Sequence, residues 1–315
     1  MHEKWKAYID LTLAMFISGS AVVVSKIMVN TMPPFLVTEI GIFLGLIILI
    51  PLTFIVKKEF YKLSLKSYLV LLGQAVCGIL LYRVFTLVGL SYTSAANSGL
   101  ITSSSPAIVV ILAYIILRER ISLKGFIGLI LVLAGLFTIN IYIYLNDGSA
   151  KNSLFGNLLI MMAVICEALF SVLSKIKCSP MSPLYRTTII VIFAFTCLLP
   201  LSIYEASAYN FSTMPLKTVA CLLYYGVFVS FLSYVFWFRG IEKVTASDAA
   251  PFTTVVPISS ILLAAVLLRE KILLVHIVGM ILIILGILIS TISTVTKVES
   301  EFGGSLEGSS AEENG

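Results

Sequence analysis

The stretch GLSYTSAANSGLITSSSPAIVVILAYIILRERISLKGFIGLILVLAG, from Gly89 to Gly135, decides the fold because the chain contains it twice. The second copy, GIEKVTASDAAPFTTVVPISSILLAAVLLREKILLVHIVGMILIILG, begins at Gly240 and keeps a constant offset of 151 positions without a gap. Residues that recur in this register include Ala95, Thr102, Pro106, Ala113, Arg118, Glu119, Ile121 and Gly128. Chance similarity among apolar residues would not align glycines, a proline and an Arg-Glu pair, so the pattern indicates an internal duplication.

The composition of the chain is that of a membrane protein. Of its 315 residues, 59% are hydrophobic and only 12% are charged, with a mean hydropathy of +1.07. A soluble core cannot bury so much apolar surface, and apolar runs of about 20 residues are long enough to cross a bilayer as helices. The formal charge of +5 does not indicate nucleic-acid binding, because the positive residues lie between the apolar runs. We therefore expect an all-helical integral membrane protein.

We expect ten transmembrane helices, five in each of two duplicated units. They are Tyr8–Ile27, Leu36–Val56, Leu69–Leu90, Ala95–Leu117, Phe126–Tyr144, Leu154–Ile176, Leu184–Tyr204, Val219–Phe238, Ala246–Leu268 and Leu273–Val295. The first unit comprises residues 1–145 and the second comprises residues 154–297. Residues 298–315 are rich in Gly, Ser and Glu and resemble an added linker, so we expect this tail to be disordered.

The distribution of basic residues predicts which side of the membrane each connection faces. With the N-terminus in the cytoplasm, 15 Lys and Arg residues lie in cytoplasmic segments and 5 lie outside, as the positive-inside bias requires. Both termini are then cytoplasmic. Because each unit has an odd number of spans, the second unit is inserted upside down relative to the first. Inverted repeats place a binding site near the midplane and expose it alternately to each side, so the pattern predicts transport.

Two motifs connect the chain to a known family. SGSAVVVSK, from Ser18 to Lys26, is similar to the WGSxFxxSK pattern of that family's first span. The second motif is a proline followed by Glu and a basic residue, and it occurs as Pro106 with Glu119-Arg120 and as Pro257 with Glu270-Lys271. Over about residues 8–296 the chain resembles an EamA-type carrier of the drug/metabolite transporter superfamily. The resemblance implies a ten-span carrier, in a family that includes exporters of amino acids and other small metabolites working by proton exchange or facilitated passage.

The chain departs from this family at two matched positions. The family usually has tryptophan near the middle of the first and sixth spans, where this chain has Ser18 and Glu167. These two residues keep the offset of 149 positions that also relates Ser25-Lys26 to Ser174-Lys175. The family's aromatic wall for the substrate therefore cannot be assumed at these two positions of this chain.

Two ionisable residues lie deep inside predicted spans. Glu167 is near the centre of the sixth span, and Arg83 is about one helical turn from the centre of the third. A charge at such a depth costs roughly 2.5–3.5 kcal/mol on insertion scales. One interpretation is structural, either a buried salt bridge or an uncharged Glu167 with a hydrogen-bond partner. The other is functional: Arg83 binds a substrate carboxylate with its planar fork, and Glu167 binds an amine or carries a coupling proton.

Hydroxyl side chains precede a proline in the predicted fourth and ninth spans. They are Thr102, Ser103, Ser104 and Ser105 before Pro106, and Thr253 and Thr254 before Pro257. Proline lacks an N–H and frees carbonyl groups inside a helix, and neighbouring hydroxyls can satisfy that backbone. These groups either repair kinked helices or line the transport pathway, and the two prolines are candidate hinges for movement of the spans.

Further residues complete the candidate site. The candidate lining residues are Ser18, Tyr82, Tyr234 and Trp237. Asn97 and Asp248 occupy matched positions near opposite membrane faces and serve either as helix caps or as gate residues. Glu39 and Lys26 lie near the outer surface, where they could pair with each other.

The motifs do not favour an enzyme or a metalloprotein. The only histidines are His2 and His276, and neither an HExxH pattern nor a glycine-rich phosphate loop occurs. We therefore expect no cofactor, no metal and no ATP-driven step. The hypothesis is a secondary transporter that exports a small polar metabolite, most simply an amino acid or similar zwitterion, and that works as a monomer in a bacterial plasma membrane. The alternatives are a proton-coupled carrier of organic cations, a non-transporting membrane receptor, and a channel.

Overall fold

The computed structural model describes residues 2–28, 31–93, 98, 101–119, 121–146, 154–176, 181–211, 214–269 and 272–290. These residues form helices and connecting segments, with no β-strand among them. The expected tail, residues 298–315, and the candidate gate residue Asn97 lie outside the described residues.

The helices follow one another with short connections. The α-helices are α1 (His2–Met28), α2 (Pro34–Ile50), α3 (Leu65–Ala75), α4 (Tyr82–Tyr92), α6 (Ser105–Leu112), α7 (Leu123–Asn146), α8 (Leu154–Lys175), α9 (Pro183–Ala208), α10 (Leu216–Tyr224), α11 (Tyr234–Ile241), α12 (Ala246–Ala249) and α13 (Val255–Leu268), followed by the helix Leu274–Ser290. Wider π-helical turns at Pro51–Val56, Val76–Leu81, Ala113–Leu117 and Tyr225–Ser233 and a 3₁₀ segment at Ala250–Thr254 continue or join several of them.

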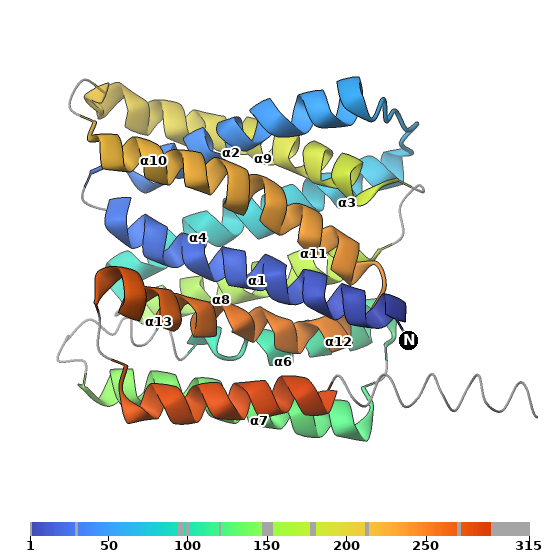
Figure 1. Ribbon diagram of the computed structural model, residues 1–315, viewed down its shortest axis with the longest axis vertical. Helices are drawn as coiled ribbons and strands as arrows, with labels where there is room; N and C mark the ends of the chain where they lie inside the picture. Colours follow the sequence, from blue (N-terminus) through green and yellow to red (C-terminus); the bar gives the residue numbers. More distant parts are fainter. Residues whose placement is uncertain are drawn as a thin grey trace, which may run out of the picture.

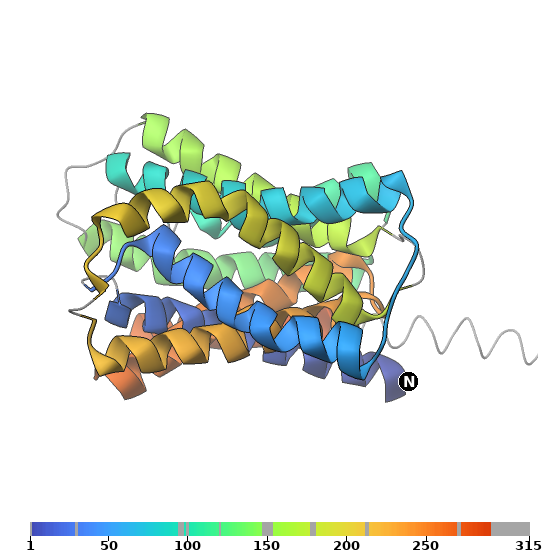
Figure 2. The same cartoon turned by 90° about the horizontal axis from the view of Figure 1, so that it is seen from above.

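The helices run side by side between two ends of the molecule, and the connections lie at those ends (Figures 1 and 2). Eight helical stretches of the described residues are long and apolar enough to cross a membrane. Two shorter apolar helices, Ser105–Leu117 and Leu274–Ser290, fall where the sequence predicts the fourth and tenth spans. The structure is therefore that of a multi-pass helical membrane protein.

Two arginines end matched helices in the same way. Arg118 has a φ of 56° and Arg269 a φ of 57°, and both lie in the left-handed region. Their backbone N–H groups donate to the carbonyls of Ala113 and Ala264, which closes the last turn of each helix. A left-handed residue after the last turn is a common helix ending, although glycine usually occupies it. The 151-residue offset relates both the arginines and the alanines.

Matched glycines allow α7 and the helix Leu274–Ser290 to touch, and Figure 1 shows the two lying along each other. A Cβ atom on Gly128 would stand 2.6 Å from the Gly286 carbonyl oxygen, and one on Gly135 would stand 2.6 Å from that of Gly279. Only glycine permits this backbone approach, which is how small residues bring membrane helices together. The contact is reciprocal, because the first glycine of each matched pair, Gly128 or Gly279, meets the second glycine of the other pair, Gly286 or Gly135.

Candidate functional site

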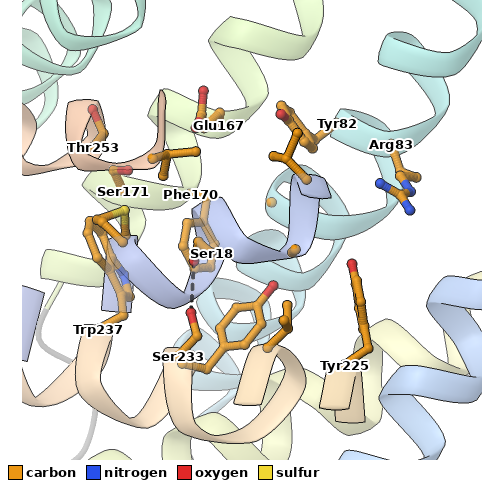
Figure 3. Close-up of a pocket in the computed structure, with 17 residues that line it drawn as sticks. Ser18, Tyr82, Arg83, Glu167, Phe170, Ser171, Tyr225, Ser233, Trp237 and Thr253 are labelled. Atoms are coloured by element: carbon orange, nitrogen blue, oxygen red, sulfur yellow. Dashed lines mark hydrogen bonds between the residues drawn. The ribbon is translucent and has the colours of Figure 1, made fainter. Parts of the chain in front are cut away.

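The first cavity lies inside the helical body and has a volume of about 420 Å³. Its lining comes mainly from α1, α4, α8, α11 and the π-helical segment before α11. Figure 3 shows polar side chains around it, including Ser18, Tyr82, Arg83, Glu167 and Thr253. Together with Tyr234 and Trp237, these are seven of the residues predicted from the sequence, and the structure places all of them at one site.

Arg83 is the cation of this cavity. It is the second residue of α4, directly after the π-helical segment Val76–Leu81, and such wide turns frequently mark functional positions. Its Nη2 donates to Thr38 Oγ1 at 2.7 Å, which connects it to α2. Its Nε is buried and has no hydrogen-bond partner among the described residues. A buried donor without a partner costs free energy, so this guanidinium would gain from an anion.

Glu167 is the acidic side chain of the cavity. Its Oε2 accepts a hydrogen bond of 3.0 Å from Ser105 Oγ. Both Arg83 and Glu167 belong to the described residues, and no ion pair joins them there. In the view of Figure 3 the Tyr82 side chain stands between the two. The structure therefore does not have the salt bridge that was one of the two structural interpretations, whereas the bond from Ser105 agrees with the other, a Glu167 with a hydrogen-bond partner; Glu167 also lines the cavity, as the functional interpretation requires.

Aromatic side chains form one wall of the first cavity. The Phe170 ring centroid lies 6.2 Å from that of Trp237, nearly stacked at 22°, and 6.2 Å from that of Tyr234 at 89°. Trp237 is buried, and its Nε1 donates to Ser174 Oγ at 3.4 Å. The wall therefore comes from α8 and α11, and Ser18 faces it from α1 through a 2.8 Å hydrogen bond with Ser233 (Figure 3).

A second cavity of about 400 Å³ adjoins the first. The two share Val22, Tyr82, Glu167, Thr253 and Val256. The second cavity is lined in addition by hydroxyl, amide and proline side chains: Thr102, Ser103, Ser105, Pro106, Asn140, Thr254, Pro257 and Ser260. Except for Ser104, the predicted pathway residues of the fourth and ninth spans therefore surround one space, and Glu167 faces both cavities.

The two prolines begin helices, which corrects the expectation of a mid-helix kink. Pro106 is the second residue of α6, and Pro257 is the third residue of α13, after the 3₁₀ segment Ala250–Thr254. Proline in a first turn costs little, because an N–H there has no partner inside the helix. The spans are thus interrupted before each proline. Thr253 Oγ1 donates to the Ala250 carbonyl at 2.8 Å, so it repairs the interruption and also lines both cavities.

Asp248 lies in the first turn of α12 and not at its N-cap position. Thr245 is the N-cap of α12, and its Oγ1 accepts from the Asp248 N–H at 3.0 Å. The remaining capping comes from Glu119, at the end of the duplicated motif. Its carboxylate accepts from the backbone N–H of Ala246 at 3.1 Å and from the N–H and Oγ of Ser247 at 3.0 and 3.1 Å. A carboxylate at a helix N-terminus satisfies donors and complements the helix dipole.

A second carboxylate joins the two halves near the opposite end of the helices. Glu205, on α9, accepts from the Leu36 N–H of α2 at 2.8 Å. Glu39, one turn further along α2, is only 5% exposed, and its two carboxylate oxygens have no hydrogen-bond partner among the described residues. The Lys26 side chain, its predicted partner, lies outside the described part.

Comparison with known proteins gives the family. The model of the EamA-like transporter family matches residues 5–141 and, separately, residues 154–292. The chain belongs to the EamA-like transporter family.

Relatives of this family member carry transporter names without a stated substrate. The chain is 36% identical over 286 residues to the uncharacterized transporter YetK of Bacillus subtilis (strain 168), covering 91% of this chain and 87% of the relative. It is 26% identical over 292 residues to the uncharacterized transporter YoaV of the same strain, covering 91% and 97%. A crystal structure that aligns with a TM-score of 0.74 covers 90% of this chain and 98% of the other, and at 17% identity it shows the fold alone.

Sequence reasoning missed several lining residues of this EamA-like chain. Asn140 on α7 donates through Nδ2 to Ser103 Oγ at 2.9 Å and to the Leu136 carbonyl at 3.0 Å. A lone amide in the apolar run TINIYIY was a visible signal. Tyr225 and Ser233 also line the first cavity, but a single tyrosine or serine in an apolar span carries no such signal.

Proposed function

We propose that this chain is a secondary transporter that moves a small polar metabolite by alternating access, and that it exports amino acids or related zwitterions. The observation that carries the proposal is the cavity containing Arg83 and Glu167, which form no ion pair among the described residues. Ionisable groups inside membrane helices are costly and mark substrate or ion pathways. A zwitterion supplies one charge for each of these groups.

The two charged side chains suit the two ends of a zwitterion. The planar guanidinium of Arg83 can bind a carboxylate through two parallel hydrogen bonds. Glu167 accepts one hydrogen bond, from Ser105, and has further acceptor positions for an amine. The same carboxylate is the natural place for a coupling proton. If Glu167 alone set the specificity, the substrate would instead be an organic cation, and the test below includes that case.

Our proposal for the architecture is ten spans in two inverted five-helix repeats, residues 1–145 and 154–297, with both termini in the cytoplasm of a bacterium and the helices in its plasma membrane. Three observations support it. The basic residues divide 15 to 5 between the two sides. The matched residues Arg118 and Arg269 end their helices with the same backbone geometry. The matched glycines of α7 and Leu274–Ser290 meet reciprocally, as an approximate two-fold axis requires.

Alternating access needs contacts between the halves that can break at one end while those at the other end hold. Two contacts between the halves are our candidates for this role. Glu119 of the first half holds the N-terminus of α12 in the second half. Glu205 of the second half holds the N-terminus of α2 in the first half. In the proposed topology the first contact closes the cytoplasmic side and the second closes the outer side. No step of this mechanism requires a cofactor or a second copy of the chain.

The test is counterflow in proteoliposomes. Vesicles containing the purified protein are loaded with a mixture of amino acids, and uptake of one labelled amino acid at a time is measured, with protein-free vesicles as the control. We expect saturable uptake that requires a loaded partner and overshoots equilibrium. Flux that rises linearly without saturation would indicate a channel instead. Ligand binding without any flux would indicate a receptor, and counterflow with amines but not with amino acids would indicate an organic-cation carrier.

A further inference from the structure

We propose that the second cavity binds an ammonium group, so that the transported zwitterion has its carboxylate and ammonium separated by a methylene stem, as in a basic amino acid. The inference rests on the proposed transport function and names the substrate class of that same site. It follows from counting hydrogen-bond donors and acceptors in the cavity lining.

The hydroxyl groups contributed by the ninth span have already used their protons. Ser260 Oγ donates to the Pro257 carbonyl at 2.9 Å, and Thr254 Oγ1 donates to the Pro251 carbonyl at 2.5 Å. Thr253 likewise donates within its own helix. A hydroxyl has one proton and two lone pairs. These three side chains can therefore accept a hydrogen bond from a ligand but cannot donate one.

The side-chain amide of Asn140, on α7, has also used its hydrogens in hydrogen bonds within the protein. Asn140 Nδ2 donates to Leu136 and Ser103, which accounts for both amide hydrogens. The orientation of the amide is fixed chemically, because the Leu136 carbonyl can only accept. The group that Asn140 retains is its carbonyl oxygen, another acceptor.

Glu167 adds a carboxylate to this lining. The Ser105 hydroxyl donates its hydrogen bond to Glu167 Oε2 at 3.0 Å, so toward a ligand it too can only accept. Tyr82, which is shared with the first cavity, carries a hydroxyl at the junction of the two spaces. Apart from Tyr82, the groups counted above would offer a carboxylate ligand only acceptors, beside the carboxyl group of Glu167. An ammonium, with three donors and no acceptor, matches the lining in both charge and hydrogen bonding.

The junction between the cavities suits an apolar stem. Val22 and Val256 line both cavities, beside Tyr82. Arg83 lines the first cavity and is absent from the lining of the second, while Glu167 faces both. A ligand whose carboxylate binds Arg83 and whose ammonium reaches Asn140 and Ser260, which line only the second cavity, would extend from the first cavity past the valines into the second. Its carboxylate binds Arg83, and its distal ammonium binds among Glu167, Asn140 and Ser260.

Four probes test this placement on the purified full-length protein, with dissociation constants measured by calorimetry. L-lysine has both ends, ε-aminocaproate lacks only the α-amine, norleucine lacks the distal ammonium, and cadaverine lacks the carboxylate. We expect L-lysine and ε-aminocaproate to bind, and norleucine and cadaverine to bind at least about tenfold more weakly, since each loses hydrogen bonds to a charged group. Norleucine binding within about threefold of L-lysine would overturn the ammonium site.

Two substitutions separate the second cavity from the general ability to transport. Ser260→Ala removes an acceptor whose proton is used inside its own helix, so it disturbs the fold least. We expect it to weaken L-lysine binding about two- to tenfold and to leave norleucine binding unchanged. Asn140→Leu should have the same selectivity and a larger effect. Thr138→Val, which removes a hydroxyl bonded to Ala134 on the same helix outside both cavities, is the matched control.

The outcomes distinguish this inference from the transport proposal. Counterflow of neutral amino acids with weak L-lysine binding would overturn the ammonium site and leave the carrier intact. Cadaverine binding as tight as L-lysine would overturn the zwitterion and point to a cation carrier. Absence of both binding and counterflow for every probe would overturn both proposals. Equal losses for L-lysine and norleucine in Ser260→Ala and Asn140→Leu would show that these side chains only support packing.

Discussion

In the proposed topology, removing the Glu119 carboxylate is expected to open the cytoplasmic end of the transporter. Three donors at the start of α12 lie 3.0–3.1 Å from its oxygens, and they belong to the opposite half of the chain. Loss of an N-terminal cap costs about 0.5–2 kcal/mol, and loss of a charge complementing the helix dipole costs about 0.3–1 kcal/mol. The variant Glu119→Ala should therefore favour the cytoplasm-open state by about 1–3 kcal/mol, a population change of about 5- to 150-fold.

The assay measures how fast a cysteine in the cavity reacts from each side of the membrane. Val22 lines both cavities and serves as the reporter, as Val22→Cys on a background without the native cysteines. An impermeant maleimide is added to inside-out or to right-side-out vesicles. Glu119→Ala should raise the labelling rate from the cytoplasmic face by roughly the population change while lowering it from the outer face.

Glu205 provides a matched control of opposite sign. Its carboxylate accepts a single backbone hydrogen bond, from Leu36 at 2.8 Å, so Glu205→Ala should cost about 0.5–2 kcal/mol. That corresponds to a shift of about 2- to 30-fold toward the outward-open state, with faster labelling of Val22→Cys from outside. Equal changes on both faces in either variant, or no change in both, would refute the assignment of these two contacts as the closures of opposite ends.

Three further predictions concern the charges and the packing. Glu167→Gln and Arg83→Gln should each fold with a melting temperature near that of the wild type and lose counterflow, because the two groups do not pair; recovery of flux in the double variant would instead indicate a salt bridge. Gly279→Ala should destabilise the protein by about 1–3 kcal/mol, since its Cβ would stand 2.4 Å from Ile139 and 2.8 Å from the Gly135 carbonyl, whereas Gly73→Ala meets nothing closer than 3.4 Å and should be tolerated. Glu39→Gln should raise the melting temperature, since it removes a buried carboxylate that has no hydrogen-bond partner among the described residues and that costs about 1–3 kcal/mol.

The fold was largely predictable because its determinants are local and repeated. Apolar runs of sufficient length specify membrane helices without knowledge of their neighbours. The duplication placed Gly128 and Gly135 in register with Gly279 and Gly286, but that these glycines face one another was learned only from the structure. The sequence predicted correctly that the helices are disturbed near Pro106 and Pro257. It predicted a kink inside each helix, whereas in the structure a helix begins there. Proline forbids a mid-helix hydrogen bond wherever it stands, and only the surrounding structure decides whether the helix bends at it or begins there.

The sequence predicted which charged residues belong to the site, but it did not predict their hydrogen-bond partners. Arg83 and Glu167 stand out because each is expensive inside a membrane. Nothing in the sequence says that Thr38 holds Arg83, that Ser105 holds Glu167, or that the two charges stay apart. Those contacts join helices whose relative rotation depends on the packing of the whole body. Asn140 is the same case: its polarity was visible, and its pairing with Ser103 depends on how α7 meets the fourth span.

The duplication also explains why a symmetric scaffold can hold an asymmetric site. The offset of 151 relates Arg83 to Tyr234 and Tyr82 to Ser233, and all four residues line the first cavity. A body built from two related halves has two arrangements of similar free energy, which exchange between sides of a membrane requires. The charges break this symmetry, since Arg83 is matched by a tyrosine rather than by a second arginine. The end contacts break it too: Glu119 accepts from three donors and Glu205 from one. In the proposed topology, the larger number of hydrogen bonds to Glu119 favours the state that is closed toward the cytoplasm. An exporter of this design would therefore need the free energy of binding its cytoplasmic substrate to offset the loss of the Glu119 hydrogen bonds.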